Sequence, residues 1–471
     1  MEGSHSQSPR LLNRSSILCA FLLLLLAAFL DAKILFQSNV AVGIDGYYYV
    51  LQIETFLRDG KFYLPTSTPA VLLLLSRIGA LIGDPVQSVK IGAILLQASL
   101  SAGIFALLVT ISRNGWIALI GMLIASFSGL HLYFIGEFIN NLGSMAFLVW
   151  GVFALARYRQ TRTTPWLIPA LLLFACALFS HRATIGIIAV IGVSVLFSLG
   201  FVRIRKICFL WIFVFLFIIA VPLALYWQPC FELPVWLSRE ILPYPQNPFR
   251  SFLLPETLMV IGAAIVGVFS LLRQKEQTDS TQVIAFLAVL IWSFFTTLNP
   301  FLSHQTGLQG IVGRLDTLIY IQAALAVPLS IAPLKASNLR KWLAAFPVAA
   351  LLAWSFLMPE PFGFQSEYLN ERAELIAYLK GNDHHLCKNP IVVAPHGRQF
   401  VITSVLGIPS QQRRSADKYY QCTFWLIQET ADDTKTEFLL VEDSHLRSII
   451  AERRGEDLSV FFAKNPHLSG D

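Results

Sequence analysis

The fold is decided by apolar runs such as SILCAFLLLLLAAFL, residues 16–30, which follows Arg10 and Arg14 and contains no charged side chain. Similar runs recur along the 471-residue chain, in which 55% of residues are hydrophobic and 14% are charged. A soluble domain carries about 25% charged residues, and a helix needs about 20 apolar residues to cross a hydrocarbon core of about 30 Å. The sequence therefore predicts an all-α polytopic membrane protein whose first helix is an uncleaved anchor.

Eleven membrane-spanning helices are predicted, at residues 16–36, 88–111, 115–134, 142–157, 165–180, 183–202, 207–227, 253–272, 281–297, 313–333 and 341–358. The short connections between them alternate between rich and poor in Lys and Arg. One rich connection holds Arg157, Arg159 and Arg162. The positive-inside rule places this set and the N-terminus in the cytoplasm. The net charge of +6 is thus a topology signal and does not indicate a nucleic-acid partner. The odd number of spans places the C-terminal tail outside a plasma (inner) membrane.

Two domains are predicted. Residues 1–358 form the transmembrane domain, whose long first outer loop, 37–87, contains an amphipathic stretch at 47–57 and an apolar segment at 70–82. The apolar segment is too short to cross the membrane and is predicted to be an interfacial helix.

Charged residues return in 359–471, which is predicted to be a small extracytoplasmic α/β domain. It has a predicted helix at 367–379 and predicted strands at 391–394, 424–427 and 438–441. Cys387 and Cys422 of this domain could form a disulfide if it lies outside the cytoplasm.

The most unusual polar segment is GIDGYYY, residues 43–49, just beyond the outer end of the first predicted span. Its acid is Asp45, and three tyrosines follow. A carboxylate at a membrane surface can take a proton from an acceptor or bind a divalent cation. Aspartate is also a good helix N-cap, so a capping role for Asp45 is the alternative.

Other polar residues fall on the same predicted outer face, namely Glu137, His181 with Arg182, His304 and Arg314. An acid so close to the membrane is costly, which makes Glu137 a functional candidate, and helix capping is its alternative. Guanidinium groups pair with phosphate in a bidentate fork, so Arg314 is a candidate clamp for a lipid phosphate. A local ion pair with Asp316 is the alternative for Arg314.

This order of features resembles the GT-C superfamily of membrane glycosyltransferases, which includes oligosaccharyltransferase catalytic subunits, protein mannosyltransferases and lipid A aminoarabinose transferases. Members carry an acidic motif in a long first outer loop, and often a second acid between the third and fourth spans. Asp45 with its tyrosines matches the first motif, and Glu137 matches the second acid in position. Arg314 resembles the late-span arginine that contacts donor phosphate in some members.

The resemblance implies an inverting glycosyltransferase that moves a sugar from a polyprenyl-phosphate carrier to a lipid, glycan or protein acceptor at the outer face of the membrane. Asp45 and Glu137 would be catalytic, and they would be the ligands of any divalent cation, Mg²⁺ or Mn²⁺. The expected substrate-binding residues are Tyr48, Tyr49, His181, Arg182, His304 and Arg314.

Two other classes of function remain open. A transporter or flippase of lipid-linked sugars would carry ionisable residues in mid-span and broken helices. The predicted spans are largely free of charge, which favours chemistry at the surface. A non-catalytic envelope polysaccharide assembly protein would use its C-terminal domain to dock a partner and would not need Asp45.

Overall fold

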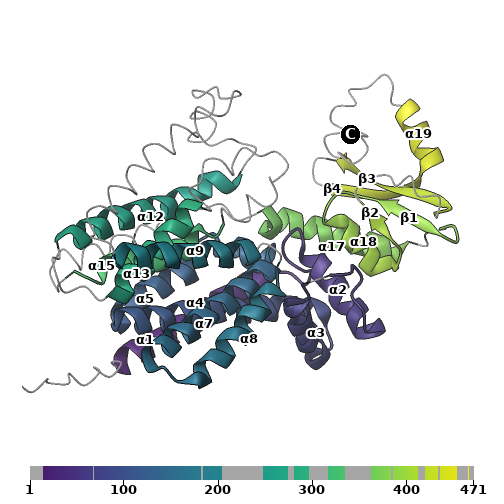
Figure 1. Cartoon of the computed structure of the whole chain (residues 1–471). Helices are drawn as coiled ribbons and strands as arrows, with labels where there is room; N and C mark the ends of the chain where they lie inside the picture. The colour runs from purple at the N-terminus through teal and green to yellow at the C-terminus, as the bar shows by residue number, and fades with distance from the viewer. Residues whose placement is uncertain are drawn as a thin grey trace, which may run out of the picture. The chain divides into compact units, whose positions relative to one another are not determined.

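The computed structural model describes residues 14–66, 68–181, 184–203, 248–273, 280–295, 317–334, 349, 362–382, 384, 386–411, 420–432, 435–452 and 465. Contacts divide the chain into two compact units (Figure 1). Unit 1 comprises Met1–Leu30, Leu95–Phe134 and Asn140–Pro359. Unit 2 comprises Asp31–Ile94, Ile135–Ile139 and Glu360–Asp471. The predicted first outer loop and Glu137 therefore share a unit with the C-terminal tail.

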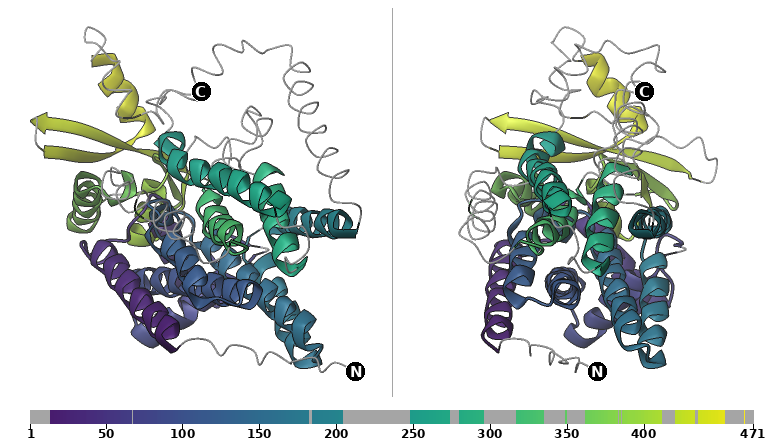
Figure 2. Two further views of the ribbon diagram at one scale, coloured as in Figure 1. Left: turned by 90° about the vertical axis from the view of Figure 1, so that its left-hand side faces the viewer. Right: turned by 60° about the vertical axis from the view of Figure 1, so that its left-hand side comes forward.

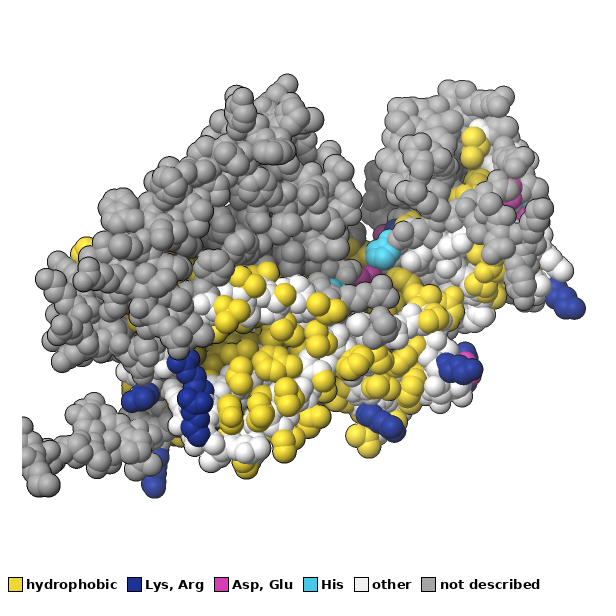
Figure 3. Space-filling view, viewed as in Figure 1, with side chains coloured by type: hydrophobic (Ala, Val, Ile, Leu, Met, Phe, Trp, Pro, Cys, Tyr) yellow, Lys and Arg dark blue, Asp and Glu magenta, His cyan; other side chains and the backbone are white. Residues whose placement is uncertain are grey.

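Three described helices are long and apolar enough to cross a membrane: α1 (Arg14–Leu35), α4 (Pro85–Ser112) and α7 (Ile139–Thr161). Large apolar side chains of α1, among them Phe21 and Phe29, stay exposed. Figure 3 shows how apolar side chains gather over the described helices. Large exposed apolar patches mark interaction sites, and lipid is the natural partner of helices of this length. These helices support a membrane-embedded protein.

Unit 1 contains further apolar helices. They are α5 (Gly115–Phe127), α8 (Leu167–Leu178) after the short η1 (Thr164–Trp166), α9 (Thr184–Arg203), α12 (Pro248–Arg273), α13 (Ser280–Phe295) and α15 (Ile319–Ile331). The predicted span 115–134 is not one helix, because Ser128 is extended after α5 and a separate α6 (His131–Gly136) follows. Predicted span 207–227, and all of 341–358 except Ala349, lie outside the described residues. The count of eleven spans is therefore not confirmed.

Helix α15 is at the centre of one group of helices in unit 1, and all of its residues are buried. It contacts α5, α12 and α13, and α13 in turn packs on α9. Local sequence sets the helix ends: the side chain of Asn114 accepts the backbone N–H groups of Trp116 and Ile117 and so caps α5. This is the contact that an N-terminal asparagine is expected to make.

The predicted first outer loop contributes two helices to unit 2, α2 (Gly46–Asp59) and α3 (Ala70–Ile82), which pack against each other. The helices predicted at 47–57 and 70–82 are thus confirmed. Each helix ends at a glycine with a left-handed backbone, Gly60 after α2 and Gly83 after α3. Glycine is favoured in that position because it has no Cβ to clash.

The C-terminal part of unit 2 contains a four-stranded sheet, whose strands are drawn as yellow-green arrows in Figure 2. The order of its strands is β2-β1-β3-β4. Its strands are β1 (Pro390–Val393), β2 (Ser410–Gln411), β3 (Cys422–Asp432) and β4 (Lys435–Glu442). Strand β1 is parallel to β2 and β3, whereas β3 and β4 form an antiparallel pair. The three predicted strands are confirmed. Strand β2 is not predicted from the sequence, because two residues are too few to show the alternation of apolar and polar side chains that marks a strand.

Helical segments of the same part of the chain pack on this sheet or on one another. They are η4 (Phe362–Phe364), α17 (Ser366–Gly381), α18 (Arg398–Leu406) and α19 (Asp443–Glu452). Helix α18 packs on both α17 and α2, and α19 packs on β3 and β4. A small apolar core joins Val393, Trp425, Ile427 and Leu446.

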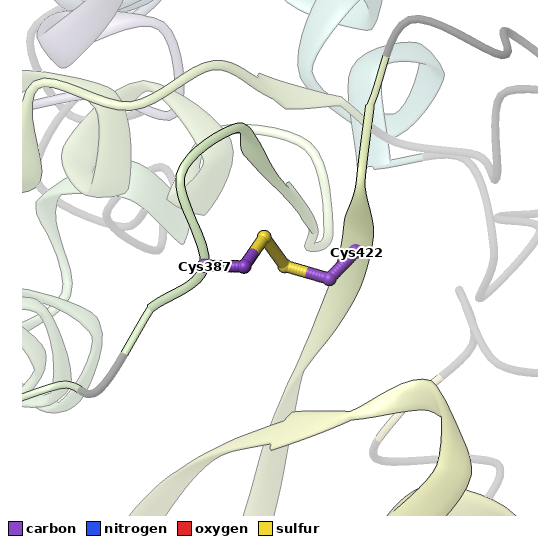
Figure 4. Close-up of a disulfide and its surroundings, with 2 residues drawn as sticks. All are labelled: Cys387 and Cys422. Atoms are coloured by element: carbon purple, nitrogen blue, oxygen red, sulfur yellow. A yellow bond between two sulfur atoms is a disulfide. The ribbon is translucent and has the colours of Figure 1, made fainter.

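Cys387 and Cys422 form a disulfide across 35 residues, with their Cα atoms 6.4 Å apart (Figure 4). The bond ties the segment before β1 to the first residue of β3. Disulfides persist mainly in oxidising compartments. The sequence predicted this disulfide only if the C-terminal domain lies outside the cytoplasm. The disulfide is present in the structure.

Candidate functional site

Asp45 precedes α2, but its side chain does not cap that helix. Its Oδ1 lies 2.9 Å from Nε2 of His396 instead, and the Asp45 side chain is 21% exposed while that of His396 is 51% exposed. The backbone carbonyl of Asp45 accepts the N–H groups of Tyr48 and Tyr49, so the main chain alone starts the helix. The capping alternative therefore does not account for the carboxylate of Asp45.

Glu137 holds the loop that carries Asp45. Its Oε1 accepts the N–H of Ile44 at 2.6 Å, and its Oε2 accepts the N–H of Asp45 at 3.1 Å. Burial raises the pKa of Glu137 to about 7; the two N–H bonds and Arg372 oppose this rise, and the charge of Asp45 adds to it. Both oxygens of Glu137 face the loop, so this side chain holds the backbone on which Asp45 stands.

Arg372 of α17 holds the same loop through its carbonyl groups. Its Nη1 donates to the carbonyls of Ala41 and Gly43, each at 2.7 Å, and its Nη2 donates to that of Ile44 at 3.2 Å. Its guanidinium also bonds the Tyr368 hydroxyl. The side chain is buried, and an unpaired buried cation would be costly. The hydrogen bonds to the loop carbonyls therefore offset the cost of burying the guanidinium group of Arg372.

The loop also requires close approach of backbone to backbone. Gly43 has φ +85°, and an added Cβ there would meet the backbone of Gly136. The N–H of Gly43 donates to the carbonyl of Gly363 at 3.1 Å. Three segments distant in sequence thus meet where only glycine leaves enough space.

Aromatic side chains line one side of Asp45. Tyr47 and Tyr49 are buried, and the hydroxyl of Tyr49 donates to the carbonyl of Glu137 at 3.3 Å. Tyr48 is half-buried and meets the ring of Phe400 edge to face at 5.4 Å. Phe400 in turn meets the His396 ring at 5.8 Å. Tyr48, Phe400 and His396 therefore form a partly exposed wall beside the carboxylate.

Of the remaining predicted substrate-binding residues, the structure describes His181 alone. His181 belongs to unit 1, where its carbonyl accepts the N–H of Thr184 at the start of α9. Arg182, His304 and Arg314 lie outside the described residues. Their roles stay predictions.

Sequence reasoning missed Arg372 and His396, although each had a signal. Arg372 shares the buried face of α17 with Leu369, Leu375 and Leu379, where a charged residue is out of place. His396 follows the end of β1, and ligands of parallel sheets bind beyond the carboxyl ends of the strands.

A divalent cation at Asp45 and Glu137 does not fit these contacts. Both oxygens of Glu137 accept backbone N–H groups, and Oδ1 of Asp45 is paired with His396. A hard cation needs several oxygen ligands that are free to coordinate it. Within the described ranges, no three His, Cys, Asp or Glu side chains gather as a ligand set. The metal prediction for these two acids therefore gains no support from their geometry.

Comparison with known proteins adds no family to these observations. No protein-family model matches the chain, and no curated protein matches it as a relative.

The packing at Gly363 gives a test of this loop. Gly363→Ala would place a methyl group 2.6 Å from Oε1 of Glu137 and 2.7 Å from Cα of Gly43. Overpacking of this kind costs about 1–3 kcal/mol, so we expect a lower apparent midpoint of thermal unfolding for the purified full chain. Gly381→Ala is the control, because its added methyl meets nothing within 4 Å. Equal midpoints for the two variants would contradict the tight approach at Gly363.

Proposed function

We propose that the chain is an inverting glycosyltransferase of the GT-C type. It transfers a sugar from a polyprenyl-phosphate carrier to an acceptor hydroxyl at the outer face of the membrane. The observation that carries the proposal is the arrangement of Asp45: its carboxylate is partly exposed and takes no part in helix capping. Buried Glu137 and Arg372 fix the backbone on which it stands.

Asp45 acts as the general base. The acceptor oxygen forms a bond to the anomeric carbon of the sugar on the face opposite the phosphate. The bond from that carbon to the phosphate oxygen breaks, and its electron pair leaves with the polyprenyl phosphate. The proton of the acceptor hydroxyl passes to Oδ2 of Asp45. A positioned base of this kind contributes about 10²–10⁴-fold to a rate.

His396 acts on the reaction through Asp45. With its Nε2 proton directed at Oδ1, the imidazole fixes the orientation of the carboxylate and leaves Oδ2 for the acceptor. His396 is therefore a positioning residue, and it comes from the C-terminal part of the chain. This gives the tail a role in the site, in contrast to a tail that serves only for docking.

The substrates suit the surroundings of the site. The rings of Tyr48 and Phe400 offer apolar faces beside Asp45 on which a sugar can rest. The apolar helices are consistent with a lipid-linked donor. The Cys387–Cys422 disulfide favours an outer location for the tail. We assign the donor phosphate to the predicted basic group of His181, Arg182, His304 and Arg314, because guanidinium pairs well with phosphate.

Replacement of Asp45 tests the proposed base directly. Asp45→Asn keeps the shape of the side chain but cannot accept the proton, so we expect transfer to fall by about 10²–10⁴-fold. The assay follows label from radioactive polyprenyl-phosphate sugars to products in membranes, at matched expression. The control is Asp59→Asn on the same helix, since Asp59 is exposed and pairs only with its neighbour Arg58 among the described residues. Transfer by Asp45→Asn at the wild-type rate would refute the mechanism.

Replacement of His396 tests its positioning role. His396→Ala should lower transfer by about a hundredfold, since Asp45 loses its orientation. Because His396 is half exposed, imidazole added to the buffer can enter the space that the removed side chain leaves, and it should restore part of the transfer rate. A role in folding alone would not respond to imidazole. His445→Ala is the control, an exposed histidine on α19 in the same unit, and it should transfer normally. A rate for His396→Ala equal to that of this control would argue against the assignment.

One observation favours transport of lipid-linked sugars as a second candidate. Glu256 of α12 is fully buried in unit 1, where its Oε1 accepts a bond from the Ser128 hydroxyl at 2.6 Å. An ionisable residue inside an apolar helix marks a pathway residue by default. Vesicles that contain the full chain should then move a fluorescent polyprenyl-phosphate sugar between leaflets, and Glu256→Gln should stop them. An enzyme that does not transport would leave the lipid where it was added and would tolerate Glu256→Gln in the transfer assay.

A further inference from the structure

Unit 1 contains a cavity of about 550 Å³ that neither Asp45 nor the proposed transfer reaction uses. Side chains of α4, α7, α9, α13 and α15 line it. Most of them are apolar, including Leu107, Val149, Val152, Ala288, Trp292 and Leu325. Ligand pockets in proteins have volumes of about 300–1,000 Å³. The cavity is thus large enough for part of a lipid-sized molecule.

The cavity is elongated along the helices that line it. Its lining residues on α7 run from Met145 to Gln160, a distance of about 22 Å at 1.5 Å per residue. Those on α13 run from Thr281 to Trp292, about 16 Å. A long apolar space parallel to membrane helices matches an extended hydrocarbon chain better than a compact solute.

One end of the cavity is basic. Arg159 and Gln160 in the last turn of α7, and Arg162 just after it, belong to the lining. The lining residues that the structure describes include no Asp or Glu. Nor does the structure give Arg159 or Arg162 an ion pair with any described residue. Both arginines are exposed at this end of the cavity, and phosphate fits the planar fork of a guanidinium group.

We infer that this cavity binds an anionic phospholipid, with an acyl chain along α7 and α13 and its phosphate on Arg159 and Arg162. Two features of the site favour this occupant. Protein interiors are close-packed, so an apolar space of this size requires molecules to fill it. The charge of the two arginines selects an anionic headgroup over a neutral one. The inference does not rest on the glycosyltransferase proposal.

A membrane-topology signal is the simpler explanation of these arginines, because cytoplasmic connections are generally basic. The chain offers a control that separates the two. Arg157 is on the same helix end but does not line the cavity. Its guanidinium lies over the Trp166 ring at 5.6 Å and donates to Gln160 Oε1 at 3.4 Å. Membrane topology depends on the number of positive charges in the connection, so Arg157 counts as much as Arg159 or Arg162. A lipid site in the cavity depends only on the arginines that line it.

The test is native mass spectrometry of the full chain in mild detergent, titrated with phosphatidylglycerol or phosphatidylcholine of the same acyl chains. Wild type should bind the anionic lipid about 30-fold more tightly, as expected for two arginines near a headgroup. Arg159→Gln with Arg162→Gln should abolish that preference, and Arg157→Gln should keep it. Ala288→Phe, which narrows the apolar part, should weaken binding of both lipids. All variants are compared as monodisperse samples with wild-type unfolding midpoints.

Other results would overturn the inference. Equal binding of both lipids by wild type would remove the anionic selectivity. An equal loss with Arg157→Gln would assign the effect to diffuse positive charge. Undecaprenyl phosphate that displaces phosphatidylglycerol from Arg159 and Arg162 at lower concentration would assign the site to an isoprenoid lipid. None of these outcomes bears on whether Asp45 supports sugar transfer.

Discussion

The loop before α2 lies between two buried groups of opposite charge, and the candidate site depends on this contact. Glu137 accepts the N–H groups of Ile44 and Asp45, and Arg372 donates to the carbonyls of Ala41, Gly43 and Ile44. The loop's own polar groups thus satisfy both charges. Either charge without the loop would be buried at high cost. The loop without them would have unpaired backbone groups.

This contact explains how a partly exposed acid is kept in a defined place. Because Glu137 and Arg372 bind only main-chain atoms of the loop, they fix the backbone and leave the Asp45 side chain to point elsewhere. His396 then takes one oxygen of the carboxylate. The two acids therefore have different surroundings. Glu137 is buried and supports the backbone, whereas the side chain of Asp45 is partly exposed.

The site also explains why the C-terminal part of the chain carries both Arg372 and His396. Arg372 lies on α17, and His396 lies between the end of β1 and the start of α18. The α/β fold of this part, with its disulfide and apolar core, holds the two side chains in one unit with the first loop. The geometry thus links the tail to the chemistry proposed for Asp45.

Local patterns in the sequence determined much of this protein. Apolar runs identified it as a membrane protein, and the periods of 47–57, 70–82 and 367–379 predicted α2, α3 and α17, because helix formation depends on neighbours three and four residues apart. Asp45 and Glu137 stood out as acids among apolar neighbours. Only the tertiary structure decided that Glu137 contacts the Asp45 loop, and that Arg372 and His396 join it. Those contacts connect residues about 90 and more than 300 positions apart. A local pattern in the sequence cannot predict such a contact, because the residues that bury and pair a charge are neighbours in the folded structure and not along the chain.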